Sequence, residues 1–230
     1  VGVYETYYTI NGGPVRSVRR DGQPRITTEG ADNQLTYWSV DLAGNEERYH
    51  SSVTIRLDRH GPNGSIQINN NAAYSTSATV KLTLLAVDST SGLDRVRYNN
   101  NDTWSNIEWE FIVATKNWTL TSGDGIKTVY YQARDKAGLI STFSDQIILD
   151  TTPPTGSITI ANGASNSNST SVILTLTAED TTSGVAQMRH NNENATWTTW
   201  EPHSNTKNWS LTSGVGNKTV YVQYMDKAGL

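Results

Sequence analysis

The chain repeats the stretch Lys116-Asn-Trp-Thr-Leu-Thr-Ser-Gly123 almost unchanged as Lys207-Asn-Trp-Ser-Leu-Thr-Ser-Gly214, 91 residues later. A second stretch, Asp135-Lys-Ala-Gly-Leu139, returns as Asp226-Lys-Ala-Gly-Leu230 at the same spacing. A fixed period indicates the architecture before any propensity is considered, because every copy must form the same structural unit. The sequence therefore predicts a tandem array.

Nearer the N-terminus the spacing is 92 residues, as between Gly64-Ser-Ile66 and Gly156-Ser-Ile158. The first 60 residues are a more distant copy, in which Tyr37-Trp-Ser-Val-Asp-Leu-Ala-Gly44 aligns with Tyr131-Gln-Ala-Arg-Asp-Lys-Ala-Gly138. We predict three domains: a partial repeat at 1–60 that lacks its first two strands, a complete repeat at 61–152, and a repeat at 153–230 that lacks its last strand. These are called the first, second and third copies below. We expect the sequence to be a window from a longer array.

Within each copy, apolar residues alternate with polar ones, as Val80, Leu82 and Leu84 do with their neighbours. This period of two predicts half-buried strands, and no segment has the 3.6-residue period of a helix. In the second copy the predicted strands are 65–68, 79–87, 95–99, 104–111, 117–120, 127–134 and 142–149. Seven short strands separated by Gly, Asn, Ser and Asp turns predict an all-β fold of tandem immunoglobulin-like β-sandwiches, arranged as an elongated array and, with no Cys, without a disulfide.

The composition excludes several classes of protein. The chain has 21 Asn, 22 Ser and 31 Thr among 230 residues, which favours polar turns between strands. A net charge of −4 gives no attraction for nucleic acid. No apolar run reaches the roughly 20 residues of a membrane helix, and Val1 does not begin a signal peptide. We therefore expect no nucleic-acid partner and no membrane span.

Three motifs carry a resemblance to a known family. Ser-Gly followed by Leu93 or Val185, the Asp-Lys-Ala-Gly stretches, and Asp150-Thr-Thr-Pro-Pro154 at a domain boundary are similar to the bacterial and archaeal Ig-like repeats of very large secreted and cell-surface proteins. The resemblance covers the whole chain. It implies a role as a spacer in adhesins, surface-layer proteins, extracellular filaments or polysaccharide hydrolases, and an extracellular or cell-surface location.

Aspartates form the strongest candidate site. In an Ig-like sandwich, the loop after the second strand and the loop after the sixth strand lie at the end where the chain enters. The topology therefore predicts two clusters, one of Asp58, Asp88 and Asp135 and the other of Asp150, Asp180 and Asp226, with Asp94 a possible addition to the first. Such oxygen-rich sets suit a hard cation such as Ca²⁺ at the junctions between domains. The alternative is that these aspartates cap turns.

Seven Asn-X-Ser/Thr sequons are candidate glycosylation sites. They begin at Asn63, Asn101, Asn117, Asn168, Asn194, Asn208 and Asn217. Strand alternation points Trp118 and Trp209 inward, so the preceding Asn117 and Asn208 should point outward and be the better acceptors.

Paired tryptophans form a further candidate surface. Trp104 and Trp109 are separated by an odd number of residues, as are Trp197 and Trp200, so in an unbroken strand the members of a pair face opposite sides. One ring could then pack in the core while Trp109 or Trp200 contacts a sugar or a partner. Packing of both rings is the alternative.

No pattern for catalysis is present. The four His residues lack metal-ligand spacing, no Gly-X-Ser-X-Gly occurs, and Glu108, Glu110 and Glu201 are interpreted as solvated charges on strands. We expect a non-enzymatic structural segment that needs no cofactor. Its partners would be further repeats of the same chain, neighbouring copies in a filament or surface array, or cell-surface glycans. The alternatives are a carbohydrate-binding or accessory module of a secreted polysaccharide-degrading enzyme and a subunit of a polymerising filament.

Overall fold

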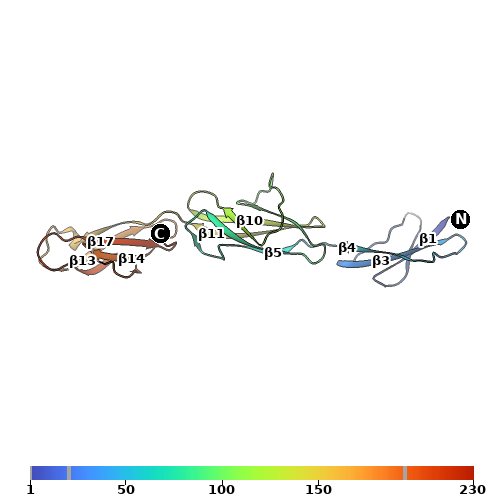
Figure 1. Cartoon of the computed structure of the whole chain (residues 1–230), viewed down its shortest axis with the longest axis horizontal. Helices are drawn as coiled ribbons and strands as arrows, with labels where there is room; N and C mark the ends of the chain where they lie inside the picture. Colours follow the sequence, from blue (N-terminus) through green and yellow to red (C-terminus); the bar gives the residue numbers. More distant parts are fainter. Residues whose placement is uncertain (1, 20–21, 194–195) are drawn as a thin grey trace. The chain divides into compact units, whose positions relative to one another are not determined.

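The computed structural model describes residues 2–19, 22–193 and 196–230. By their contacts they separate into two compact units, one of Val1–Ile66, Leu84–Ala114 and Tyr130–Ser144, and the other of Gln67–Thr83, Thr115–Val129 and Asp145–Leu230. The strands of the second copy include β5 (Asn63–Ile68), β7 (Thr79–Val87), β10 (Gly125–Asp135) and β11 (Ile140–Leu149); Figure 1 labels β5, β10 and β11.

The fold is all-β, as predicted. In the described ranges there is no α-helix, and the only helical turn is the 3₁₀ turn η1 at Ala161–Gly163. No helix in those ranges is long and apolar enough to cross a membrane. The alternation of apolar and polar residues in the sequence appears in the structure as alternating burial. β7 and β13 (Ser171–Glu179) have the same residue-by-residue pattern of buried and exposed side chains.

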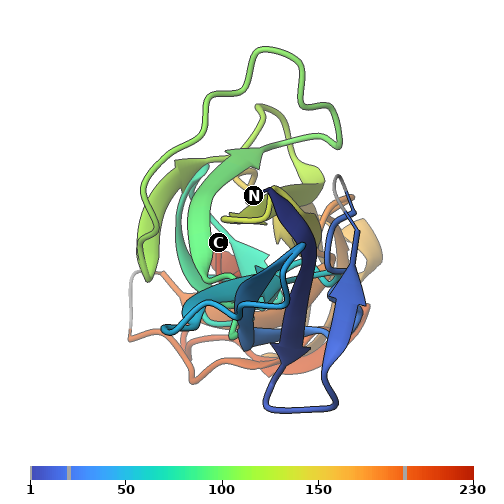
Figure 2. The ribbon, with the colours of Figure 1, turned by 90° about the vertical axis from the view of Figure 1, so that its right-hand side faces the viewer.

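The N-terminal part of the first unit is an antiparallel sheet in the order β2-β1-β3-β4. Its strands are β1 (Val3–Ile10), β2 (Arg16–Val18), β3 (Gly30–Asp41) and β4 (Ser51–Leu57), and Figure 2 shows β1 (dark blue) in front. Tyr8 and Leu35 are buried on one face of this sheet, and Trp38, which pairs with Tyr7, is buried on the other. In the same unit, β8 (Leu93–Asn99) pairs with the second half of β10 around the buried Val96 and Ala133.

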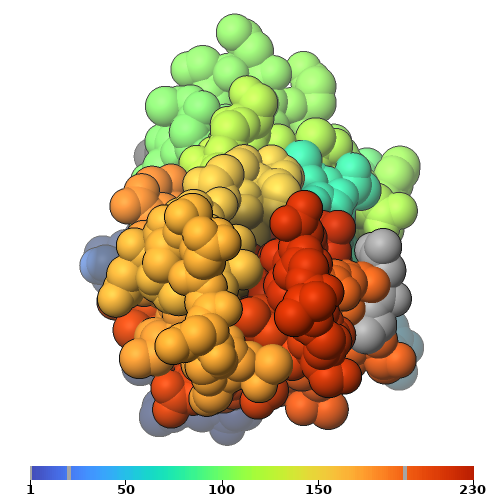
Figure 3. All heavy atoms as spheres, turned by 90° about the vertical axis from the view of Figure 1, so that its left-hand side faces the viewer, coloured from blue at the N-terminus to red at the C-terminus, as the bar shows by residue number. Residues whose placement is uncertain are grey.

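The second unit contains a complete pair of packed sheets. One has the order β12-β13-β16 and the other β15-β14-β17. Their strands are β12 (Thr155–Ile160), β13, β14 (Val185–Asn192), β15 (Glu201–Pro202), β16 (Thr206–Ser210) and β17 (Val220–Asp226). Leu174 and Leu176 from the first sheet pack against Met188 and Val220 from the second, which makes this a β-sandwich. In Figure 3, the exposed residues that follow β12 (yellow-orange) lie at the surface of this part.

In the second copy the first of these sheets has the equivalent order, and the second sheet has two strands, β6 (Tyr74–Ser75) and β11, in place of an equivalent of β15. The strands form a sheet β5-β7-β9 and a sheet β6-β11-β10-β8, with β9 at Thr115–Thr119. Two sheets of this kind, antiparallel apart from the short parallel pairing of β6 with β11, are the immunoglobulin-like arrangement that the sequence predicts. The predicted boundaries between the three domains stay a prediction.

One local prediction was wrong, and one short strand was missed. The strand expected at 104–111 is absent, and the chain there is a long loop (green in Figure 2) whose only ladder contact is a bridge between Val96 and Glu110. The short strand β6 was not foreseen, because two residues are too few to produce an alternating pattern. β6 pairs in parallel with the end of β11, and its Ser75 accepts a hydrogen bond from the backbone N–H of Asp150.

Candidate metal centre

The first predicted set of aspartates lies together. Asp58 follows β4, Asp88 follows β7, and Asp135 ends β10. One carboxylate oxygen from each lies within 4.8 Å of the others. The predicted topology therefore brings three negatively charged side chains from separate segments to one point. Carboxylates this close repel one another in the absence of a cation.

Each of these aspartates also caps a turn. Asp88 Oδ1 accepts hydrogen bonds from the backbone N–H of Ser91 at 2.9 Å and of Gly92 at 2.6 Å. Asp135 Oδ1 accepts one from Leu139 at 2.9 Å. Turn capping, the alternative interpretation of the sequence, is thus present in the structure. It uses only one of the two oxygens of Asp135.

The second oxygen of Asp135 points to a ligand. Asp135 is 1% exposed, and its Oδ2 has no hydrogen-bond partner among the residues that the structure describes. A buried carboxylate oxygen without a donor loses its hydration without replacement, which costs free energy. A bound cation would supply the missing interaction. The donors here are all carboxylate oxygens, which are the ligands that Ca²⁺ prefers.

Asp58 is the member of the first set that comes from the linker before β5. Its Oδ2 accepts a hydrogen bond from the backbone N–H of Ser91 at 3.1 Å, and its Oδ1 accepts one from His60 at 3.2 Å. The Ser91 side chain, and after it the backbone N–H groups of His60 and Ser91, hold the pKa of Asp58 below its ordinary value. This carboxylate therefore remains available to a cation in mildly acidic solution.

The second predicted set repeats the arrangement. Oxygens of Asp150, Asp180 and Asp226 lie within 4.8 Å of one another. Asp180 Oδ1 caps its turn through the N–H groups of Ser183 and Gly184, at 2.8 and 2.6 Å. Both Asp150 Oδ2 and Asp226 Oδ2 are buried without a hydrogen-bond partner in the described part of the chain. This set has two unpartnered buried oxygens where the first has one, so it has the stronger need for a cation.

The first copy provides an internal comparison at Asp41, which aligns with Asp135 and Asp226. Asp41 Oδ1 accepts hydrogen bonds from the N–H groups of Ala43 and Asn45, at 2.8 and 2.9 Å. Its Oδ2 accepts a third, at 2.9 Å, from the side-chain amide of Asn45, and this bond is the largest cause of the lowered pKa of Asp41. Asn45 stands where the other copies have leucine. Asp41 is therefore satisfied within its own turn, whereas Asp135 and Asp226 are not.

Asp94 does not join the first set. Arg134 donates to Asp94 Oδ2 through Nε at 2.9 Å and through Nη2 at 2.6 Å. Asp94 is thus paired with Arg134, and it is not among the acids whose oxygens lie within 4.8 Å of one another at the first set. The expected contribution of Asp94 is therefore wrong.

Asp124 holds the linker that contains Asp150, by accepting hydrogen bonds from the two threonines that follow Asp150. Asp124 Oδ1 accepts hydrogen bonds from the backbone and the hydroxyl of Thr151, at 3.0 and 2.8 Å, and Oδ2 accepts one from the Thr152 hydroxyl at 2.7 Å. The bonds from Thr152 and then Thr151 lower the pKa of Asp124. Because Pro153 follows, Thr152 is also biased toward an extended backbone. The linker thus enters the second cluster in a defined conformation.

The tryptophan pairs do not face opposite sides. The Arg97 guanidinium lies over both Trp104 and Trp109, at 4.9 and 4.3 Å from the ring centroids. Arg189 lies in the same way over Trp197 and Trp200, at 5.2 and 4.4 Å. The prediction failed because these segments are loops, in which odd spacing does not set the face. Contact of Trp109 or Trp200 with a sugar or a partner stays a prediction.

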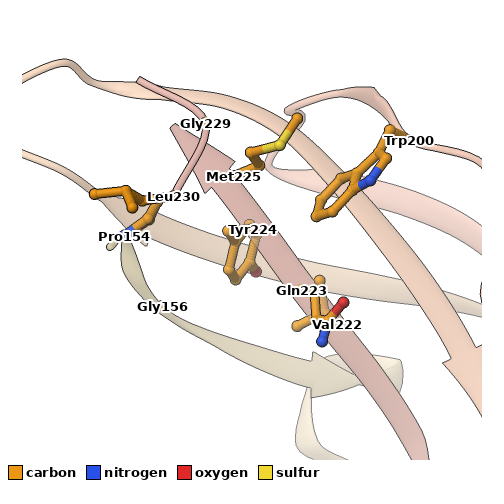
Figure 4. Close-up of a pocket in the computed structure, with 9 residues that line it drawn as sticks. All are labelled: Pro154, Gly156, Trp200, Val222, Gln223, Tyr224, Met225, Gly229 and Leu230. Carbon is orange, nitrogen blue, oxygen red and sulfur yellow. The ribbon is translucent and has the colours of Figure 1, made fainter. Parts of the chain in front are cut away.

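Trp200 also lines a groove of about 490 Å³ in the third copy (Figure 4). Trp200 lies beside Met225, while Tyr224 points toward β12 and donates a hydrogen bond to the Ser157 carbonyl at 2.9 Å. Met225 aligns with Arg134, which stacks on Trp109 in the second copy. The replacement of Arg134 by methionine makes this face of the third copy less charged.

Replacing Arg97 should loosen the long loop of the second copy. Arg97 donates hydrogen bonds to Gln132 Oε1 at 2.9 Å and to the carbonyls of Trp104 and Ile107 at 3.3 and 3.4 Å. We expect Arg97→Met to destabilise the second copy by about 1–2 kcal/mol and to speed proteolysis within residues 100–109. Arg95→Met is the control, because Arg95 stacks on the exposed Phe111 and, within the described residues, donates only to the carbonyl of the adjacent Asp94, at 3.4 Å, so it does not hold the loop tryptophans. Equal effects of the two variants on unfolding and cleavage would contradict this role.

The candidate glycosylation residues lie at the surface where they are described. Asn63, Asn101, Asn117, Asn168, Asn208 and Asn217 are exposed, and Asn194 lies outside the described residues. Trp118 and Trp209, which follow two of them, are half-buried as expected from alternation. Glycosylation itself stays a prediction.

No family model matches the chain, and no curated protein matches its sequence. Among solved structures, the fibronectin(III)-like modules of Clostridium thermocellum CbhA match with a TM-score of 0.39 and 14% identity, over 71% of this chain and 87% of that one. A Ca²⁺-stabilized adhesin of an Antarctic bacterium that binds ice matches with a TM-score of 0.35 and 17% identity, over 98% of this chain and 65% of that one. The tetra-tandem repeat in the extending region of a large adhesion protein gives 0.28 and 15%, over 98% and 63%. The chain spans less than two thirds of both adhesin structures.

Proposed function

We propose that the chain is a non-catalytic structural segment of a large extracellular or cell-surface protein, such as a stalk, a surface-layer region, a filament or an adhesin spacer, and that divalent cations hold its repeat junctions. The observation that carries this proposal is the equivalent pair of aspartate clusters. Each joins an acid from the linker, Asp58 or Asp150, to two acids from the copy that follows.

The donor chemistry selects the class of cation. All three side chains in each cluster offer carboxylate oxygens, and hard cations with several oxygen ligands fit such a set. Ca²⁺ accepts variable coordination numbers and flexible geometry, whereas Mg²⁺ requires a near-ideal octahedron. We therefore assign Ca²⁺ to both clusters, with Asp58, Asp88 and Asp135 holding one ion and Asp150, Asp180 and Asp226 the other.

A cation at these positions acts on the linker. It would neutralise three neighbouring carboxylates and tie the residue that leaves one copy to the turns of the next. The cation would then fix the orientation of each copy relative to the next without a large interface between them. This property suits a spacer, because a spacer must hold a distance and need not bind a substrate.

Calcium should raise the thermal stability of the chain, and a chelator should lower it. A ligand that binds only the folded state stabilises it by about 2.7 kcal/mol at a hundredfold excess over Kd. We expect calorimetric titration of metal-free protein to show two Ca²⁺ ions per chain, Mg²⁺ to bind more weakly, and small-angle scattering to show greater flexibility in chelator. Identical melting curves in Ca²⁺ and in chelator would refute the cation sites and leave the aspartates as turn caps.

A further inference from the structure

A histidine lies at the centre of the third copy. His190 on β14 is fully buried, and its ring packs against Trp209 with centroids 5.4 Å apart. Its Nδ1 lies 3.3 Å from Glu201 Oε1, but the two groups are not aligned for a hydrogen bond. The ring nitrogens thus have no hydrogen-bond partner in the described part of the chain.

Two charged groups act on this ring. Glu201 on β15 forms an ion pair with Lys207 on β16 through its other oxygen, so the carboxylate is already shared. Glu201 is therefore not the solvated charge that the sequence suggested. The packed strands contribute mainly apolar side chains: β17 places Val222 opposite His190, and β13 contributes Val172, Leu174 and Leu176 to the same core. The ionisable group that packs on this core from β17 is Tyr224, and burial raises its pKa, so it stays neutral in mild acid.

The second copy has a tyrosine at the equivalent position. Tyr98 lies 92 residues before His190, on β8, and is 3% exposed. Glu110, Lys116 and Trp118 align with Glu201, Lys207 and Trp209. The residue opposite on the neighbouring strand differs, being Tyr131 in the second copy and Val222 in the third. Burial raises the pKa of Tyr98, which therefore stays neutral from acid to neutral pH. The two copies differ at this point in having a group that can gain a proton in mild acid.

We propose that His190 makes the third copy an acid-sensitive element, in which protonation inside the core loosens the sandwich while the second copy stays intact. The observations behind this are the complete burial of the ring, its lack of a hydrogen-bond partner in the described part of the chain, and the exchange of His for Tyr beside the same Glu, Lys and Trp. The proposal is independent of the cation sites, since His190 contacts none of their aspartates.

The direction of the effect follows from the pKa. Burial lowers the pKa of His190; Glu201 opposes this shift and Lys207 adds to it. The unfolded chain, with a histidine pKa of about 6.5, then binds a proton more readily than the folded one. The contribution of neutral His190 to the free energy of unfolding is therefore fully present above a pH of about 6.5. It decreases as the pH falls below this value, and it stops decreasing only below the lower pKa that His190 has in the folded state.

Hydrogen exchange can measure this effect in each copy separately. Between pH 7.5 and 5.5, above the usual pKa range of carboxyl groups, we expect the protection of β13 and β14 amides to fall by up to about tenfold after correction for intrinsic exchange. Amides of β7 and β8 in the second copy are the internal reference and should keep their protection. The experiment is done in chelator, so that loss of a cation cannot contribute.

Two reciprocal variants and one direct titration complete the test. His190→Tyr should remove the pH dependence from the third copy, and Tyr98→His should introduce it into the second. If either variant does not fold, the ring signals of His190 in the wild-type chain still report its pKa by NMR. A His190 pKa at or above 6.5, or an unchanged pH dependence in folded His190→Tyr, would overturn the proposal.

Discussion

Asp226→Asn is expected to lower the melting temperature of the chain in calcium and to leave it unchanged or raise it in chelator. In calcium the variant loses one of three ligands, which removes up to about 2.7 kcal/mol of stabilisation at a hundredfold excess of Ca²⁺ over Kd. In chelator the same change removes one of three mutually repelling charges. The asparagine amide also takes the position of the unpartnered Oδ2 and can donate to the neighbouring carboxylates.

The turn itself should survive this substitution. Asp226 Oδ1 accepts hydrogen bonds from the N–H groups of Gly229 and Leu230, at 2.7 and 3.0 Å, and asparagine keeps an oxygen in that place. The difference between the variant and the wild type therefore isolates the second oxygen.

Asp41→Asn is the matched control for this experiment. Asp41 has the same place in its copy and the same type of turn, but its Oδ2 is already bonded to Asn45. We expect the control to change stability by the same amount in calcium and in chelator. If Asp226→Asn also shows no dependence on calcium by differential scanning calorimetry, the second cluster holds no cation.

The strands and the aspartate clusters could be predicted from the sequence because both depend on local patterns and on the repeat. The strand predicted at 79–87 agrees with β7 at both ends, since strict alternation over nine residues determines burial. The clusters followed from topology, because loops at one end of a sandwich must come together. The unpartnered oxygens of Asp135, Asp150 and Asp226 depend on side-chain geometry that no spacing encodes.

The loop at 100–114 could not be predicted in the same way. Both of its tryptophans pack against Arg97, which lies on β8 outside the loop. Alternation within the loop therefore does not predict which way the two rings face. His190 was accessible to sequence reasoning but was missed. Its alignment with Tyr98 and its place two residues after Met188 both mark it as a core position, whereas a search for metal-ligand spacing does not.

Leu174→Ala should destabilise the third copy by about 2–5 kcal/mol, the cost of a cavity at a fully buried leucine. Leu82 is equally buried and lies 92 residues earlier, so Leu82→Ala should cost the second copy a similar amount. Ile173→Ala is the control, because Ile173 immediately precedes Leu174 on β13 and is 51% exposed. We expect its effect to stay within about 0.5 kcal/mol.

The two leucine variants also test the predicted boundaries at 61–152 and 153–230. If the copies fold independently, Leu174→Ala lowers protection from hydrogen exchange only in β12 to β17, and Leu82→Ala lowers it only in β5 to β11. Loss of protection across both copies in either variant would show one cooperative unit and contradict the boundaries. Independent folding is what a spacer requires, because a local defect or an acid-induced opening at His190 then stays within one repeat and leaves the rest of the chain folded.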